Sequence, residues 1–139
     1  METNGISAGL ITVQSDFSVQ ETITRLISFA QGKGLTIFFQ IDHANNAERL
    51  GIQLRPTQLI EFGNPRGGTP LLLDQQTIGL DLPIRVLCWQ DNKERNWITY
   101  NDPQWLVQRH ALTEKSQNTI ETITKGMNDI CSLAAGNKL

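Results

Sequence analysis

Residues able to do chemistry gather in a few short stretches of this sequence. The stretch FGNPRGGTP, Phe62 to Pro70, places Arg66 among glycines and prolines, and IDHANN places His43 directly after an apolar run. TYNDP contains Tyr100, and QRHAL, a few residues further on, contains His110. An arginine beside free backbone N–H groups is typical of a site that grips a carboxylate or a phosphate. The first chemistry that the sequence indicates is therefore the binding of an anion.

The 63–70 segment has two interpretations. Thr69 followed by Pro70 is typical of an N-cap and first helical residue, so the segment is expected to lead into a helix whose dipole favours an anion. Asn64, Arg66, Gly68 and Thr69 would then line the site. The alternative is a plain connector between a strand and that helix. The spacing excludes a phosphate-binding P-loop, because G-x-x-x-x-G-K-[ST] is absent, and G-x-G-x-x-G is absent as well.

The two histidines permit acid–base or metal chemistry only if the fold brings them together. His110 could instead be a helix C-terminal residue favoured by the dipole, and His43 a polar residue at a strand end. No G-x-S-x-G, HExxH or paired-carboxylate motif occurs. These observations favour a protein without catalytic activity, and they leave any metal or cofactor unassigned.

Periodicity predicts the elements that must position these residues. Ser18 and Glu21 form a capping box at the start of an amphipathic helix, and Leu35, Ile37, Phe39 and Ile41 alternate with polar or aromatic neighbours as in a strand. Asp102 and Pro103 predict a further helix start. The remaining predicted elements are strands in GLITVQSD, TQLIEFG, IRVLCWQ and NWITYND, the last two joined by DNKER, a helical turn near NNAERLGI, a leucine-rich helix after Thr69, and a last helix over about 114–134.

This order predicts an α+β domain. About five mostly antiparallel strands would form one curved sheet, with two long amphipathic helices packed on one face as a second layer. Residues 1–8 are small and polar and are expected to be disordered, whereas 9–139 are expected to form one domain.

Composition narrows the classes of partner. The formal net charge is −2 with no basic run, which argues against nucleic acid. No apolar run approaches the roughly 18–20 residues of a transmembrane helix, and the N-terminal residues lack the pattern of a signal peptide. Cys88 and Cys131 lie far apart on predicted apolar faces, so both are expected to be reduced core residues of a cytoplasmic protein. One disulfide is the alternative.

Several motifs together resemble a known family. IDHANNA, FGNPRGGTPLLL, GLDLPIRVLCWQD and WITYNDPQWLVQRHAL follow in order the pattern of the small bacterial and archaeal proteins called domain of unknown function 302. The resemblance implies an α+β fold similar to the TATA-binding protein, and homodimers, but no activity. Arg66 and Gly67 depart from the family pattern, which commonly has a lysine and a small residue at these two positions. Because arginine stands in place of the lysine, a cation is kept there.

The function expected from residues and resemblance together is a non-enzymatic module that binds a small anionic ligand. The 63–70 segment would form its pocket with His43 and His110, and Tyr100 would lie in the same region. A homodimeric structural or interaction protein is the first alternative, and a histidine-based metal-binding protein or enzyme is the second.

Overall fold

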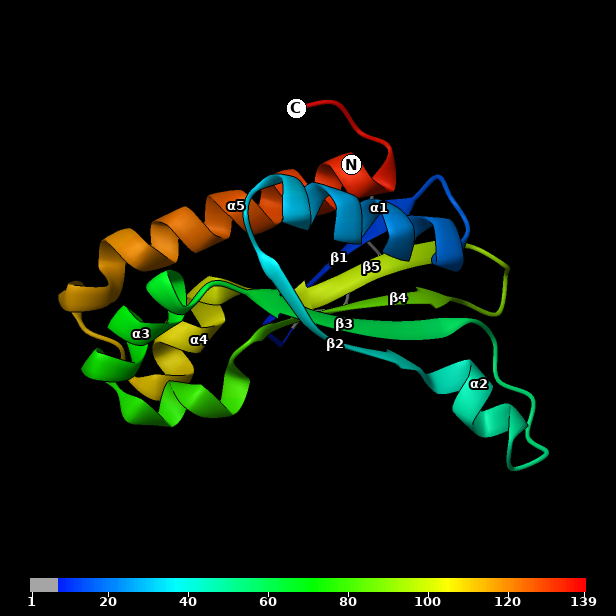
Figure 1. The fold of residues 1–139 in the computed structure, drawn as a ribbon, viewed down its shortest axis with the longest axis horizontal. Coiled ribbons are helices and arrows are strands. Elements are labelled where there is room, and N and C mark those ends of the chain that lie inside the picture. The colour runs from blue at the N-terminus through cyan, green and yellow to red at the C-terminus, as the bar shows by residue number, and fades with distance from the viewer. Residues whose placement is uncertain (1–7) are drawn as a thin grey trace.

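A five-stranded antiparallel sheet with two long helices across one face forms the body of the protein (Figure 1). The computed structural model describes residues 8–139, so the disorder expected over residues 1–8 lies, apart from residue 8, outside this range. The strands are β1 (Leu10–Ser15), β2 (Thr36–Asp42), β3 (Thr57–Gly63), β4 (Ile84–Gln90) and β5 (Asn96–Asn101). The helices are α1 (Val19–Gly32), α2 (His43–Glu48), α3 (Pro65–Asp74), α4 (Pro103–His110) and α5 (Gln117–Ala135), with 3-10 turns η1 (Gln76–Asp81) and η2 (Glu114–Ser116).

The strands lie in the order β1-β5-β4-β3-β2, and every neighbouring pair is antiparallel. Helices α1 and α5 lie side by side on one face of this sheet (Figure 1). Their apolar residues meet the alternating inward residues of the strands, so the burial of this surface stabilises the fold. The core includes Ile23, Leu26, Ile60, Val86, Ile98, Ile130 and Ala134. The predicted α+β class and its two-layer arrangement are confirmed.

Local capping signals start helices α1 and α4 where the sequence predicts. The Ser18 hydroxyl accepts a hydrogen bond from the Glu21 N–H at 3.1 Å and caps α1. Asp102 caps α4 in the same way, with Pro103 as the first helical residue. Cys88 and Cys131 are both buried and unbridged, and burial raises the pKa of each thiol. The expectation of two reduced core cysteines is confirmed.

Strand β2 does not keep the simple alternation that its sequence suggests. A register shift between Ile37 and Phe39 inserts a bulge, so Ile37 pairs with Phe62 whereas Phe39 pairs with Glu61. Ile37 therefore faces the helices, and Phe39 lies on the opposite face of the sheet with 52% of its surface exposed. The prediction that these two residues share one face is wrong.

The helix after β3 begins five residues earlier than Thr69-Pro70 suggests. Asn64 is its N-cap, because its side-chain oxygen accepts from the Arg66 N–H at 2.9 Å, and Pro65 is the first helical residue. Asn64-Pro65 thus provides the same start signal as Thr69-Pro70, and Pro70 lies inside α3. The leucine-rich segment also divides, since α3 ends at Asp74 and η1 follows.

Candidate ligand-binding pocket

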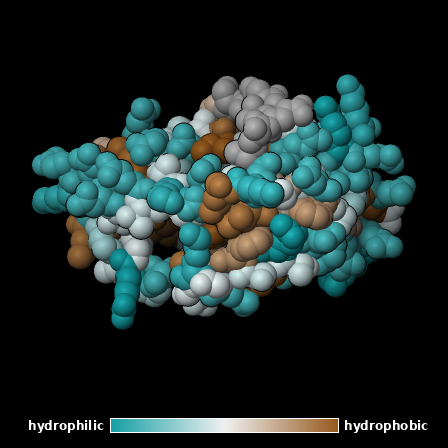
Figure 2. All heavy atoms as spheres, turned by 90° about the horizontal axis from the view of Figure 1, so that it is seen from above, coloured by the Kyte–Doolittle hydropathy of each residue, from teal (hydrophilic) through white to brown (hydrophobic). Residues whose placement is uncertain are grey.

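The 63–70 segment forms one wall of a large open cavity, which has a volume of about 1100 Å³. The facing wall is the inner side of α5, and the end of α1, the start of β2 and the Leu82–Ile84 segment complete the lining. We call this cavity the α3–α5 pocket. In the space-filling view the surface is hollowed toward the end of the molecule where α3 lies, and apolar atoms border the hollow (Figure 2).

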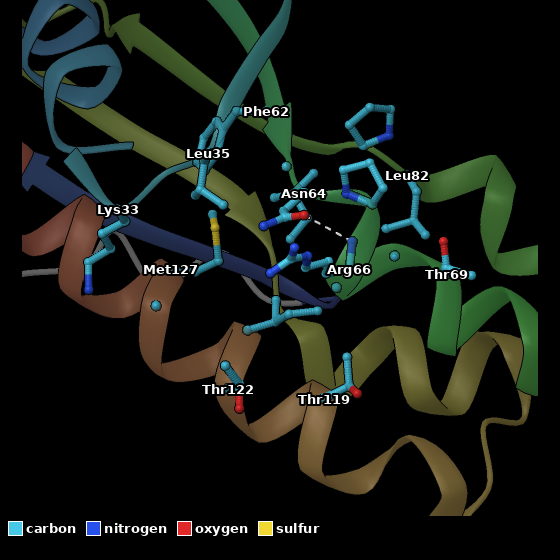
Figure 3. Close-up of a pocket in the computed structure, with 18 of the residues that line it drawn as sticks. Lys33, Leu35, Phe62, Asn64, Arg66, Thr69, Leu82, Thr119, Thr122 and Met127 are labelled. Atoms are coloured by element: carbon cyan, nitrogen blue, oxygen red, sulfur yellow. Dashed lines mark hydrogen bonds between the residues drawn. The ribbon is translucent and has the colours of Figure 1, made fainter. Parts of the chain in front are cut away.

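Apolar side chains form most of the inner surface of the α3–α5 pocket. Met127 on α5 points toward Leu35, and Asn64 and Arg66 lie beside these two residues, above α5 (Figure 3). The apolar part of the lining consists mainly of Leu35, Phe62, Leu72, Leu82, Ile123 and Met127. A concave apolar site with a few polar groups is the usual form of a small-molecule site.

The charged groups of the α3–α5 pocket are Lys33, Arg66, Lys125, Glu121 and Asp129, with a formal sum of 3 − 2 = +1. Asp129 is shared by two of the cations, since Lys125 Nζ lies 2.8 Å and Lys33 Nζ 3.7 Å from its Oδ2. The hydrogen bond from Lys125, with the charge of Lys33, holds the pKa of Asp129 below its ordinary value. Within residues 8–139 no carboxylate lies within 4.0 Å of the Arg66 guanidinium.

The backbone N–H groups of the 63–70 segment are not free, contrary to expectation. The Arg66 N–H donates to the side chain of Asn64, and the Gly67 and Gly68 N–H groups donate to the Asn64 carbonyl at 2.8 and 3.1 Å. Because α3 starts early, these N–H groups donate to Asn64 within the first turn of the helix. Any attraction of an anion to this wall therefore comes from the Arg66 side chain.

The structure gathers four of the seven candidate residues and separates the other three. Asn64, Arg66, Gly68 and Thr69 line the α3–α5 pocket. His43, the exposed first residue of α2, lies at the opposite end of the molecule (Figure 1). Tyr100 is 4% exposed within the core, where burial raises its pKa. The expectation that His43 and His110 form this pocket with the 63–70 segment is wrong.

His110 instead belongs to a buried polar cluster beneath η1. Its Nε2 contacts Asp81 Oδ2, and its Nδ1 lies 3.0 Å from the Thr77 hydroxyl. Arg109 approaches the other Asp81 oxygen at 3.6 Å. The side chains of His110 and Asp81 are each 5% exposed, so the pair ties η1 to the end of α4. Because Asp81 directly precedes Leu82, this tie also holds one wall of the α3–α5 pocket in place.

The α5 side of the pocket was missed in the sequence. Gly126 and Met127 lie on α5, fifty residues or more from the 63–70 segment, and only the fold brings the two together. One signal was available, because a glycine in the middle of a long amphipathic helix weakens that helix and invites a functional explanation.

Asp74 holds the end of α3 against the start of α5. Its carboxylate accepts from the Ser116 hydroxyl at 2.6 Å and from the N–H and hydroxyl of Thr113 at 2.8 and 2.9 Å. These bonds, led by that from Ser116, outweigh the opposing effect of burial and hold the pKa of Asp74 below its ordinary value.

A carboxyl group with a lowered folded-state pKa stabilises the protein above its unfolded pKa of about 3.9 and loses that contribution as pH falls through the folded value. We therefore expect Asp74→Asn to lower the free energy of unfolding at pH 7 and to lose less stability than the parent below about pH 4. Urea unfolding from pH 7 to pH 3 measures both effects, with Glu48→Gln on α2 as an exposed control. Equal acid sensitivity of Asp74→Asn and the parent would contradict this role.

Two further properties follow from the described residues. Across residues 8–139, no three or more His, Cys, Asp or Glu side chains cluster in a way that could hold a metal ion. In the same range, no helix has the length and apolar character needed to cross a membrane.

Comparisons with known proteins agree on the fold. The crystal structure of an uncharacterized conserved protein DUF302 from Bacillus stearothermophilus superposes with a TM-score of 0.80, covering 93% of this chain and 99% of that chain at 21% identity. At this identity the likeness shows the fold alone.

Curated relatives are closer in sequence. The chain is 46% identical over 132 residues to a protein named fluoride-specific ion channel FluC 1 of Brucella suis biovar 1 (strain 1330), covering 95% of this chain and 52% of that one. Proteins named FluC 1 of Brucella abortus and FluC 2 of Brucella melitensis match at the same identity, with 49% of each covered. The chain thus spans about half the length of these relatives. The family described as Domain of unknown function DUF302 matches residues 11–130, and this chain belongs to that family.

Proposed function

We propose that this protein is a non-enzymatic module that binds a small anionic ligand in the α3–α5 pocket. The observation that carries the proposal is Arg66, a cation at a large concave site that has no carboxylate partner within the described chain. The other two cations of the pocket already share Asp129, so an arriving anion finds its free positive charge at Arg66.

The walls of the proposed site differ from those that the sequence suggests. Asn64, Gly68 and Thr69 remain beside Arg66, but α5 replaces the two histidines as the facing wall. Asn64 fixes the first turn of α3 through its cap and thereby fixes where the Arg66 side chain begins. Among the described residues no histidine or cysteine lines this pocket, which favours binding over catalysis.

A thermal-shift series with carboxylates, phosphates and nucleotides tests this function, because a ligand that binds only the folded state raises the melting temperature by mass action. We expect at least one anionic class to stabilise the protein. Arg66→Gln should weaken that binding about three- to tenfold, the range for an exposed charge-assisted contact. Arg49→Gln, at the exposed C-cap of α2, is the matched control. No shift from any anionic class would remove the proposal.

A second candidate function comes from the relatives. Three proteins named as fluoride-specific ion channels contain this domain over about half of their length. Domains joined in one chain in some organisms often work together when separate, so we propose that this domain assists a fluoride channel. Fluoride export from cells with and without the protein measures this role, and identical export under fluoride stress would count against it.

A further inference from the structure

Three glycines line the α3–α5 pocket from inside helices: Gly67 and Gly68 in α3, and Gly126 in α5. None of them has a positive φ angle, so none is required by backbone geometry. A Cβ atom at Gly67 or Gly126 would meet nothing within 4 Å, and at Gly68 it would meet only Leu82 at an ordinary 3.6 Å. Glycine inside a helix costs about 0.5–1 kcal/mol relative to alanine. Packing among the described residues does not explain these glycines, and at Gly67 and Gly126 the missing side chain leaves open space beside the pocket.

A bare ion would fill only a small part of the pocket. A water-sized species takes up about 30 Å³, and an inorganic phosphate is only a few times larger, compared with about 1100 Å³ here. Leu35, Leu82 and Ile123 are only partly buried, so they would then remain in contact with water. An occupant with an apolar body would cover these side chains and gain the free energy of their burial.

The charges around the pocket favour an occupant whose apolar body carries one acidic group. Of the three cations at the pocket, Lys33 and Lys125 are held by Asp129, and Arg66 alone has no carboxylate partner among residues 8–139. In Figure 3 the Arg66 side chain lies beside Asn64, with Thr69 on one side of it and Leu35 and Met127 on the other. A molecule with a single acidic head and an aliphatic tail matches this division.

We propose that the occupant of the α3–α5 pocket is an amphiphilic carboxylate of the alkanoate class. Its head pairs with Arg66, and its alkyl chain runs past Gly67 and Gly126 along the apolar wall. This inference rests on the proposed function, since it names the ligand class of the same site. The same acyl chemistry reaches a protein either as a free carboxylate or as part of an anionic lipid surface, and the experiment separates these sources.

The test is titration calorimetry on the full chain with octanoate and dodecanoate below their micellar concentrations. Acetate and inorganic phosphate supply the head alone, dodecanol supplies the tail alone, and phosphatidylglycerol vesicles supply a lipid surface. We expect dodecanoate to bind at one site, at least tenfold more tightly than octanoate, because each buried methylene is worth about fourfold. Acetate should not bind measurably. Arg66→Gln should weaken dodecanoate binding while leaving dodecanol binding unchanged.

The outcomes of these titrations distinguish the proposal of an alkanoate ligand from the broader proposal of an anion-binding function. If phosphate or acetate binds at Arg66 as tightly as dodecanoate, the anion site stands and the amphiphilic ligand is wrong. If no anion of any kind binds, both proposals fall. Binding of vesicles without binding of free dodecanoate would overturn the assignment of a free carboxylate, and equal loss of dodecanol and dodecanoate binding in Arg66→Gln would overturn the role of the head group.

Discussion

Gly126→Phe should abolish dodecanoate binding, with an affinity loss of more than tenfold, while the protein remains folded. A side chain at position 126 meets open space in the α3–α5 pocket, so a phenyl ring would occupy the volume that we assign to the alkyl chain. The ring itself adds apolar burial and replaces a poor helix former, so global stability should not fall. Calorimetry with dodecanoate and urea unfolding measure the two effects separately.

Two variants control this prediction. Gly126→Ala should raise the free energy of unfolding by about 0.5–1 kcal/mol, because it removes the glycine penalty and meets no neighbour, and it should keep most of the binding. Asn128→Phe places the same ring on an exposed position of α5 that does not line the pocket, and binding should stay as in the parent. Undiminished dodecanoate affinity in Gly126→Phe would contradict the location of the ligand.

His110→Ala should destabilise the protein by about 3 kcal/mol, the upper end of the range for a hydrogen bond to a charged group. The change removes the contact with Asp81 and the hydrogen bond with Thr77, and it leaves the buried Asp81 carboxylate with Arg109 at 3.6 Å as its remaining charged partner. Thermal and urea unfolding measure the loss.

Matched variants separate the buried pair from simple loss of volume. Thr77→Val removes one hydrogen bond and should cost only about 1 kcal/mol. The double variant Asp81→Ala/His110→Ala should lose less stability than the sum of the single changes, because it leaves no buried carboxylate without its histidine partner. A cost below 1 kcal/mol for His110→Ala would show that the pair does not hold η1 to α4.

Much of the fold could be predicted from local patterns. The capping signals at Ser18 and Asp102 and the alternation in β3 depend only on near neighbours along the chain, and the structure keeps them. The bulge after Ile37 depends on pairing with β3, which no local pattern specifies. Asn64-Pro65 and Thr69-Pro70 are equivalent start signals, and choosing between them required the rest of the fold.

The candidate site, like the fold, could be predicted from the sequence only where its residues are near neighbours along the chain. Arg66 and its neighbours in sequence were predictable because one helix start holds them together, and they do line one pocket. The facing wall on α5 is distant in sequence, so its contribution was hidden until the topology was known. The partner of His110, Asp81, lies 29 positions away in the sequence. Because the sequence does not reveal this partner, a histidine with a structural role could be mistaken for a ligand-binding residue.

The most direct measurement of the central claim is the NMR signal of the Met127 methyl group. The sequence contains two methionines, of which Met127 lines the α3–α5 pocket. Protein labelled with ¹³C at the methionine methyl groups therefore reports on the site through the Met127 peak. Met127→Leu identifies that peak by its disappearance. We predict that dodecanoate shifts the Met127 signal in a saturable way and that the shift is lost in Gly126→Phe. Saturable dodecanoate binding that leaves the Met127 signal unchanged would contradict the claim that the ligand occupies this pocket.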